Sequence, residues 1–501
     1  MAKNLFNSVQ QQKPKKNVFD LTHDVKMSAK MGKLLPTLVT ECVPGDTFQI
    51  GCESLIRFAP MIAPVLHRMD VSMHYFFVPN RILWSNWEDF ITNANSVHAL
   101  PVLEDVQDWT AEQQKFADYM GIPPYTGSAE ESSWSLNALP FAAYQAIYNE
   151  YYRDQNLISP VDYKLQDGTN SNSPFLNQRY RAWEHDYFTS SLPFAQKGSA
   201  VDIPIGQIED NVPVKWYNAG DTTLTGSPTS ILVDGANANE PNIPPDTLFA
   251  QTLGLEVGAT TINDLRRAFR LQEWLEKNAR GGTRYIENIL MHFGVRSSDK
   301  RLQRPEYITG TKSPVVISEV LNTTGEDAGL PQGNMAGHGV SVTSGKYGSY
   351  FCEEHGYIIG IMSIMPKTAY QQGIPRTYLK NDTLDFFWPS FAHIGEQPVQ
   401  KNEIYAWTNT GPDTFGYVPR YAEYKFMPSR VAGDFRTTLD YWHLGRKFAT
   451  DPALNQTFIE CTPEQVERIF AVQTEEDNLY CHILHKIRAV RPMPKFGTPM
   501  F

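Results

Sequence analysis

Five arginines and two adjacent glycines lie between residues 279 and 307, in a segment that is also rich in aromatic side chains. Gly281 and Gly282 allow a tight turn at positive φ. Planar guanidinium groups form bidentate hydrogen bonds to carboxylates or phosphates, a chemistry suited to joining subunits. We therefore interpret the segment as a subunit-contact surface. Its candidate residues are Arg280, Arg284, Tyr285, Arg301, Arg304 and Tyr307.

Two other patterns could bind a nucleotide or a metal, and both depart from what that chemistry needs. Residues 339–346 are similar to a phosphate-binding loop, but they carry one residue too many between the glycines, and Tyr347 stands where Ser or Thr would meet magnesium. His482 and His485 are three residues apart in an alternating segment, so we expect one packed and one exposed histidine.

Patterns typical of catalysis are missing from the sequence. It contains no Gly-x-Ser-x-Gly elbow and no cupin-type His-x-His motif with a downstream Glu. Adjacent acids such as Glu353 and Glu354 lack the separation that a glycosidase needs. Five cysteines without Cys-x-x-Cys spacing favour buried free thiols. We expect no catalytic residue, no cofactor and no metal ligand, and hence no enzyme.

The segment Arg420–Arg436 interleaves cations with aromatic residues, as single-strand binders do. Protein interfaces have the same composition, because Arg and Tyr are enriched there too. We favour an interface and keep DNA contact as the alternative.

Composition and charge narrow the class of protein. The 501 residues are 41% hydrophobic, which is ample for a packed core, and length alone allows several domains or one β-domain with long insertions. The formal charge is −11, yet the first 33 residues carry seven Lys and two Asp, and residues 478–501 carry four cations and no acid. No apolar segment has the length of a signal peptide or a membrane span, so we expect a soluble, unsecreted protein.

Hydrophobic periodicity predicts strands near both ends of the chain. Residues 71–78 alternate as a strand with one buried face, 356–365 form an apolar run suited to burial on both faces, and 479–490 alternate again. Residues 1–33 are predicted to be a basic, flexible arm. The pattern favours an antiparallel barrel or sandwich whose first and last strands are neighbours, and the jelly roll is one such solution.

Helices and one long loop interrupt these strands. Thr110 and Gln113 form a capping box for a helix ending at Gly121, and a second helix begins near residue 140. A third covers 262–280, with a cap at residue 261 and a Glu273–Lys277 pair. Residues 462–465 can start a short helix. The acidic segment 199–258 is predicted to be a functional excursion or a solvated connection.

Short motifs along nearly the whole chain resemble those of the major capsid proteins of the Microviridae, the small icosahedral single-stranded DNA phages, and most closely their gokushovirus-like branch. Besides the segment 279–307, the motifs are Phe19–His23, Pro44–Phe48, Phe76–Arg81, Asp186–Ser190, Glu354–Tyr357, Tyr370–Gly373, Ile394–Gln397 and Arg491–Pro494. The resemblance implies a mainly β fold, a single eight-stranded antiparallel jelly roll (the viral β-barrel) over residues 34–501. Helical insertions would fall at about 85–160 and 261–280, and a variable, protruding loop at about 199–258.

The resemblance also implies partners. The chain would assemble through homopentamers into a T=1 shell of 60 copies around a circular single-stranded DNA genome, with a small basic DNA-binding companion protein and minor virion proteins. It would be assembled in the bacterial cytoplasm and located in the virion, and its loop would contact a host-surface receptor. The basic ends suit contact with the packaged genome. The candidate genome-facing residues are Lys13, Lys15, Lys16, Lys486, Arg488 and Arg491.

Two other classes of function remain open at this point. A jelly-roll enzyme or carbohydrate-binding module would stay monomeric and bind sugars in a concave site. A cytosolic single-strand-binding protein would bind oligonucleotides as an isolated subunit with steep salt dependence, which the acidic middle of the chain disfavours.

Overall fold

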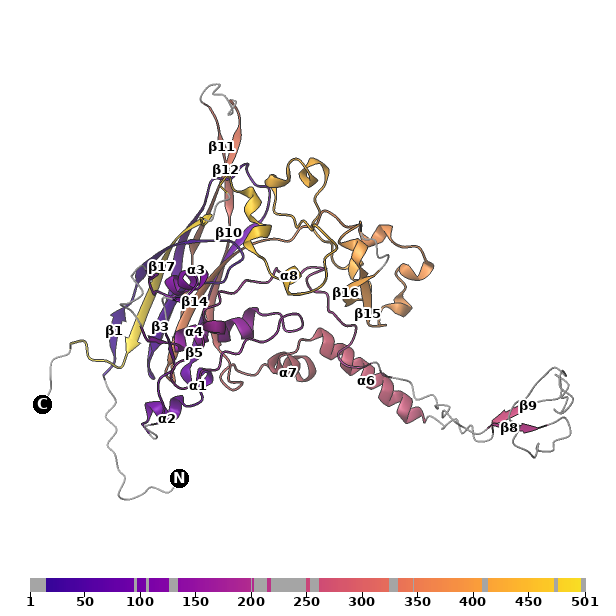
Figure 1. The fold of residues 1–501 in the computed structure, drawn as a ribbon, viewed down its shortest axis with the longest axis horizontal. Helices are drawn as coiled ribbons and strands as arrows, with labels where there is room; N and C mark the ends of the chain where they lie inside the picture. Colours follow the sequence, from indigo (N-terminus) through magenta and orange to yellow (C-terminus); the bar gives the residue numbers. More distant parts are fainter. Residues whose placement is uncertain are drawn as a thin grey trace, which may run out of the picture. The chain divides into compact units, whose positions relative to one another are not determined.

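The protein is mainly β, with several antiparallel sheets and a smaller share of helix (Figure 1). The computed structural model describes residues 15–93, 97–104, 108–125, 134–199, 201, 214–217, 249–252, 261–323, 332–345, 347–407, 413–472 and 476–496. The chain divides into two units, one made of residues 1–195 with 280–501 and the other of residues 196–279. The second unit contains the predicted variable loop and the predicted helix 262–280.

The larger sheet joins the two ends of the chain. Its strand order is β1-β17-β4-β12-β11, with β2 also on β17 and β13 also on β4. These strands are β1 (Asn17–Asp20), β2 (His23–Ala29), β4 (Thr47–Phe58), β11 (Val316–Leu321), β12 (Met335–Ser344), β13 (Gly348–Phe351) and β17 (Leu479–Arg491). Because β1 pairs antiparallel with β17, the predicted contact between the first and last strands is confirmed. Residues 339–344, the segment similar to a phosphate loop, form part of β12.

The smaller sheet has the order β10-β5-β14-β3. Its strands are β10 (Glu306–Pro314), β5 (Met69–Pro79), β14 (Gly356–Pro366) and β3 (Leu35–Cys42). Strand β14 is buried along its whole length, which confirms the prediction of a strand with two buried faces. The prediction that β5 has one buried face is wrong. Tyr75 and Phe77 pack between the two sheets, whereas Phe76 and Val78 pack against helices.

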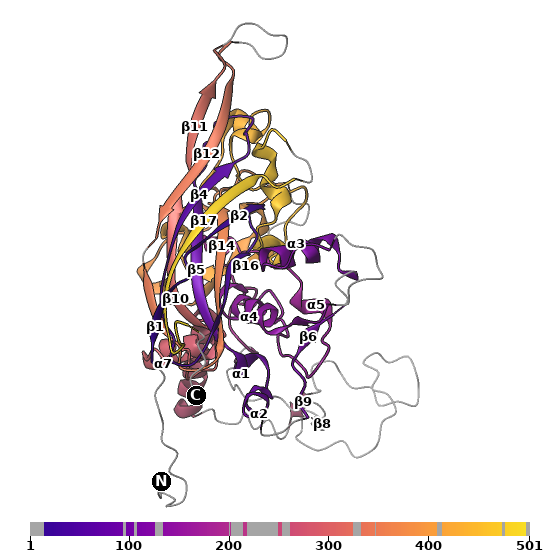
Figure 2. The ribbon, with the colours of Figure 1, turned by 90° about the vertical axis from the view of Figure 1, so that its left-hand side faces the viewer.

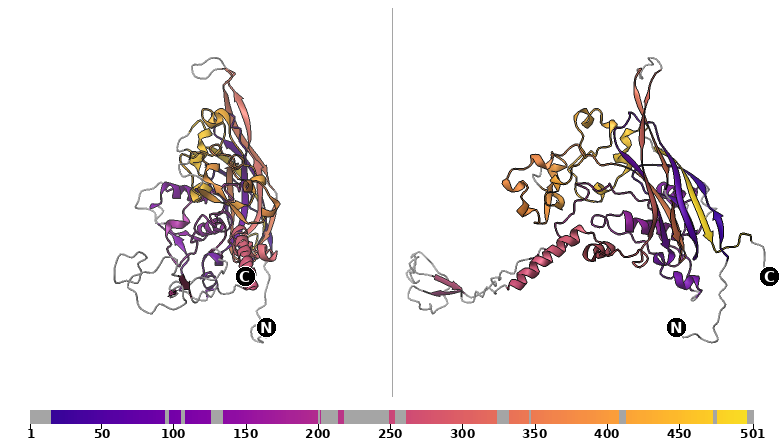
Figure 3. Two further views of the ribbon diagram at one scale, coloured as in Figure 1. Left: turned by 90° about the vertical axis from the view of Figure 1, so that its right-hand side faces the viewer. Right: turned by 180° about the vertical axis from the view of Figure 1, so that it is seen from behind.

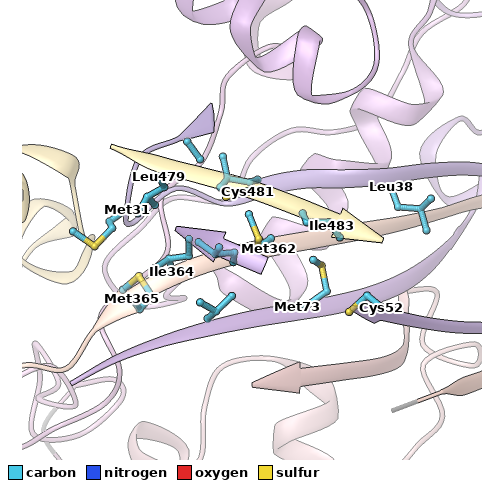
Figure 4. Packing of buried hydrophobic residues seen from close by; sticks show 14 of the residues in the cluster. Met31, Leu38, Cys52, Met73, Met362, Ile364, Met365, Leu479, Cys481 and Ile483 are labelled. Carbon is cyan, nitrogen blue, oxygen red and sulfur yellow. The ribbon is translucent and has the colours of Figure 1, made fainter. Parts of the chain in front are cut away.

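Two hydrophobic cores therefore flank the smaller sheet. The first lies between the sheets, and Figure 4 shows Ile483 of β17 beside Met73 and Met362 of the smaller sheet. The second lies between the smaller sheet and helices, where Leu139, Phe141 and other buried residues of α4 pack. Figures 2 and 3 show these purple helices on one side of the strands. The architecture therefore has three layers, which are the larger sheet, the smaller sheet and the helices.

His482 and His485 confirm the predicted alternation of β17. The His482 side chain is exposed and lies beside Asp24, with Nε2 2.9 Å from Oδ1. His485 is fully buried, and its Nε2 donates to the Thr37 carbonyl at 3.0 Å while its Nδ1 accepts from the Tyr75 hydroxyl at 2.8 Å. Burial lowers the pKa of His485 to about 4.

The predicted helices are present. The α-helices are α1 (Asn80–Leu83), α2 (Trp87–Ile91), α3 (Ala111–Tyr119), α4 (Leu139–Ile147), α5 (Asn172–Phe175), α6 (Ile262–Arg280), α7 (Tyr285–Phe293) and α8 (Gln456–Ile459), and α4 continues into the π-helical turn η2 (Tyr148–Tyr152). The capping box of Thr110 and Gln113 is formed, as is the Glu273–Lys277 ion pair at 3.0 Å. Helix α7 was not among the predicted elements.

Residues 367–470 form an irregular region whose small core contains Tyr370, Phe415 and Phe458, packed with Tyr187 from outside the region. It contains β15 (Glu396–Gln400), β16 (Thr414–Pro419) and a series of 3-10 turns. These turns are η3 (Arg376–Tyr378), η4 (Thr383–Asp385), η5 (Pro389–Phe391), η6 (Lys401–Glu403), η7 (Ala422–Tyr424), η8 (Gly433–Arg436), η9 (Asp440–Trp442), η10 (Pro463–Gln465) and η11 (Glu467–Ile469). Turn η10 confirms the short helix predicted at 462–465. Two further strand pairs are β6 (Val102–Leu103) with β7 (Leu136–Asn137), and β8 (Val214–Tyr217) with β9 (Phe249–Thr252).

The ordered part of the chain begins earlier than predicted. Strands β1 and β2 lie within residues 1–33, and both pair with β17. In β2, Val25, Met27 and Ala29 face the core while their neighbours face solvent, which gives this segment an apolar face to bury. Residues 1–14, including Lys13, lie outside the described residues, as does most of the predicted loop 199–258.

Candidate subunit-contact surfaces

The carboxyl end of the α4–η2 helix binds two of the five clustered arginines. The last carbonyls of a helix lack partners within it, and the negative end of its dipole attracts cations. Arg284 Nη2 donates to the carbonyls of Asn149 at 2.9 Å and Arg153 at 3.0 Å. Arg304 Nη2 donates to the Glu150 carbonyl at 3.3 Å. These two arginines thus cap a helix of their own chain.

Charged and aromatic contacts hold the same two arginines in place. The Glu150 carboxylate lies 3.9 Å from Arg284 Nε and 3.7 Å from Arg304 Nε. Arg304 also pairs with Asp299 at 3.4 Å, lies over the Tyr151 ring at 4.7 Å, and is only 9% exposed. These contacts lie within one chain and do not test contacts to a second copy, so the interface assignment of both arginines stays a prediction.

The other four predicted contact residues differ in whether they have a partner within the chain. Arg280 Nε donates to Glu396 Oε1 at 3.0 Å, and burial lowers the pKa of its guanidinium to about 10. Tyr285 is 69% exposed, Tyr307 is half exposed, and Arg301 is exposed. Four of the six predicted residues, Arg280 included, are therefore exposed in the single chain, although Arg280 already pairs with Glu396.

The Gly281–Gly282 turn is needed for close packing as well as for its backbone conformation. Only Gly282 has a positive φ, at 99°. Gly281 keeps an ordinary φ, but a Cβ there would collide with the Met291 side chain. The turn directs the chain into α7, whose Leu290 and Phe293 side chains are largely exposed. Together with Tyr285, they form an apolar surface on this short helix.

Removing the Arg304 side chain is expected to lower the free energy of unfolding by about 2–3 kcal/mol, because Asp299 and the Glu150 carbonyl would lose their cation and Glu150 would keep only Arg284. Urea unfolding of the Arg304→Ala subunit, followed by tryptophan fluorescence, measures this. The matched control is Arg301→Ala, three residues away and exposed, which should change the free energy by less than about 0.5 kcal/mol. Equal effects of the two variants would contradict the capping role.

A second surface, which we call the aromatic face, lies in the irregular region. It consists of Leu384, Phe386, Phe387, Trp388, Tyr424, Phe426 and Met427, each about half exposed or more, and Met427 is 93% exposed. Phe387 joins its two segments, since its ring lies 6.2 Å from the Tyr424 ring and 5.0 Å from the Tyr421 ring. A contiguous exposed apolar patch of this kind marks a protein–protein contact.

Two cations fix the shape of the aromatic face. Lys380 Nζ lies 4.0 Å from the centre of the Tyr424 ring and 5.4 Å from that of Phe386. Arg420 Nη2 donates to the Leu384 carbonyl at 2.8 Å, and its guanidinium lies over Tyr421 at 4.6 Å. Lys380 and Arg420 therefore position the aromatic rings, which leaves the apolar side chains exposed with little conformational freedom to lose on binding.

The basic candidates near the chain ends also differ in their surroundings. Lys15, Lys16 and Arg488 are exposed. Lys486 pairs with Glu53 across the sheet. Arg491 pairs with the fully buried Asp46, with Nε 3.1 Å from Oδ2, and lies over the Phe48 ring. Arg491 thus holds the end of β17 in place, and its contact with a genome stays a prediction.

All five cysteines are free and buried, as predicted. No group of three or more His, Cys, Asp or Glu side chains in the described ranges could hold a metal ion. None of the described helices has the length and apolar character needed to cross a membrane.

Comparison with known proteins gives a consistent result over the length of the chain. Residues 7–501 match the family described as "Capsid protein (F protein)". The chain is 34% identical to "Capsid protein VP1" of Chlamydia phage 1, over all of this chain and 98% of that protein. It is 36% identical to "Capsid protein VP1" of Bdellovibrio phage phiMH2K and 30% identical to that of Spiroplasma virus 4, in each case over 96% of this chain and 94% of the relative.

Proposed function

Because the chain belongs to the capsid protein (F protein) family of Microviridae-like phages, and is therefore a structural component of the virion, we propose that it forms a T=1 icosahedral shell. In this proposal, 60 copies associate through homopentamers and enclose a circular single-stranded DNA genome. The observation that carries the proposal is the aromatic face. Its exposed apolar side chains would be removed from water when the subunit binds another protein surface, which stabilises the assembly.

The fold fits a shell-forming role. Two facing antiparallel sheets support assignment of residues 34–501 as a single jelly-roll domain with eight strands as its frame, and β1 and β2, which pair with β17, would extend this domain to Asn17. The insertions at about 85–160 and 261–280 correspond to helices α2 to α4 and α6. Assembly would cover the aromatic face, Tyr285 and Tyr307 at contacts between copies.

Charge supports the remaining partners. The acidic body cannot by itself neutralise phosphate, so we propose a small basic companion protein at the genome, with minor virion proteins completing the particle. Lys13, Lys15, Lys16, Lys486 and Arg488 would face the DNA. The acidic loop 199–258, which carries few bases, would face outward and contribute to host attachment.

Electron microscopy of the expressed protein tests the proposal. Small isometric shells of uniform size are the expected result, and sedimentation velocity should show a pentamer before shells appear. Dispersed monomers under every assembly condition, or a monomer that binds sugars, would contradict it.

A further inference from the structure

A cleft of about 300 Å³ lies at one end of the smaller sheet. Its walls are residues 66–68, which precede β5, residues 367–369, which follow β14, and residues 429–432, with Phe435, Trp442 and His443. Met69 of β5 pairs with Pro366 of β14, so the first two segments leave the sheet side by side. The third segment joins them through the hydrogen bond from the Tyr370 N–H to the Ser429 carbonyl, at 2.9 Å. We call this site the arginine cleft.

The walls carry cations but no carboxylate. Lys367 is neutralised by Asp70, 3.0 Å away, and by Glu184, which both lie outside the cleft. Arg68 and Arg430 are exposed, and neither forms an ion pair with any carboxylate in the described part of the chain. Two uncompensated guanidinium groups at one cleft, in a chain of charge −11, indicate an anionic ligand.

The cleft is rigid before any ligand arrives. His67 Nε2 donates to the Lys367 carbonyl at 2.6 Å, and the Leu66 N–H donates to the Trp442 carbonyl at 2.8 Å. His443 Nε2 donates to the Phe435 carbonyl at 2.7 Å, while its Nδ1 accepts the Gly445 N–H at 2.9 Å. With both ring nitrogens engaged, His443 is a neutral part of the wall. The walls themselves would need little ordering on binding, so the entropy cost falls on the side chains of Arg68 and Arg430.

Aromatic rings line the cleft beside the cations. Phe435 and Trp442 are half-buried, with ring centres 6.5 Å apart and planes at 60°. Guanidinium groups next to accessible aromatic rings are the combination that binds single-stranded nucleic acid, with stacking worth about 1–3 kcal/mol per base. A bare anion would use the cations and leave the rings without a partner.

We propose that the arginine cleft binds one nucleotide of single-stranded DNA, with its phosphate on Arg68 and Arg430 and its base against Trp442 and Phe435. This assignment rests on the proposed function, since a packaged single strand is the source of the ligand. It also divides the segment Arg420–Arg436 between two roles. Residues up to 427 form the aromatic face, and Arg430 belongs to a DNA site.

Fluorescence anisotropy of labelled oligothymidylate with unassembled subunits, over a series of NaCl concentrations, tests the assignment. The double variant Arg68→Gln, Arg430→Gln should bind at least about tenfold more weakly. Its slope of log K against log salt should be smaller by about 0.7 for each phosphate that a guanidinium group no longer neutralises. Trp442→Leu should weaken binding with an unchanged slope. The control Arg267→Gln, an exposed arginine of α6 with the same change of charge, should bind as the unmodified chain does.

Several outcomes would overturn the assignment. One is a double variant that melts and binds oligothymidylate like the unmodified chain. A second is competition by inorganic phosphate at the same concentration of phosphate groups, which would indicate a site for free phosphate. A third is a double variant that binds the oligonucleotide normally but forms no shells, which would indicate that Arg68 and Arg430 pair with a carboxylate of a neighbouring copy. Absence of shells from the unmodified chain would contradict the proposed function. The binding measurements on unassembled subunits would still show whether the arginine cleft binds DNA.

Discussion

Replacing Phe426 and Met427 together by serine is expected to abolish shell formation while leaving a folded subunit. Both side chains lie on the aromatic face and are 60% and 93% exposed, so the change removes almost no packing from the single chain. Each buried side chain of this size contributes about 1.5–3 kcal/mol at a contact. Because the contact recurs in every subunit of a closed shell, the concentration needed for assembly should rise more than about 100-fold.

Sedimentation velocity and electron microscopy measure this effect, and thermal melting shows that the subunit is folded. The control is Val97→Ser, an 81% exposed apolar side chain that lies outside the aromatic face. It should assemble as the unmodified chain does. If the Phe426, Met427 variant forms shells at the ordinary concentration, the aromatic face is not a contact between copies.

Replacing His485 by alanine is expected to lower the free energy of unfolding by about 3–4 kcal/mol. The change opens a cavity between the sheets and leaves the Tyr75 hydroxyl and the Thr37 carbonyl without their buried partner. Urea unfolding of the unassembled subunit measures the destabilisation. His482→Ala, on the exposed face of the same strand, should change the free energy by less than about 0.5 kcal/mol. Similar destabilisation by both variants would contradict the role of His485.

The same histidine should make the fold sensitive to acid. Its pKa is about 4 in the folded chain, because burial and the nearby His23 oppose the charged form, against roughly 6.5 when unfolded. Protons therefore bind the unfolded chain first, and the stability that is present above pH 6.5 falls as the pH drops toward 4. The decrease is on the order of 3 kcal/mol. His485→Gln, which can still donate to Thr37 and accept from Tyr75, should flatten this part of the pH profile, and an unchanged profile would exclude His485 as its cause.

The sequence predicted correctly those strands and helices whose burial or caps depend on residues within the same element. The apolar run of β14, the alternation of β17 and the caps of α3 and α6 depend on residues that are close together in the sequence, and the structure contains all of them. Strand β5 was misjudged because Ser72 and His74 interrupt an otherwise apolar strand, and because α4, which packs with Phe76 and Val78 on that face, comes from elsewhere in the chain.

Sequence patterns could not predict the roles of the clustered arginines. Nothing near Arg284 or Arg304 in sequence shows that their partners are carbonyls 131 to 154 residues earlier. The arginine cleft was also missed, because Arg68 and Arg430 come together only where β5 begins and β14 ends. Spacing of exposed hydrophobic residues at 384–388 and 424–427 was the signal that could have indicated the aromatic face.

The position of β17 sets the order of events during synthesis on the ribosome. This strand lies between β4 and the N-terminal strands β1 and β2, yet it follows β4 by roughly 420 residues. Until it emerges, the nascent chain holds β4 without one neighbour and β1 and β2 without any. Translation itself therefore delays completion of the larger sheet until the last strand of the chain has been made.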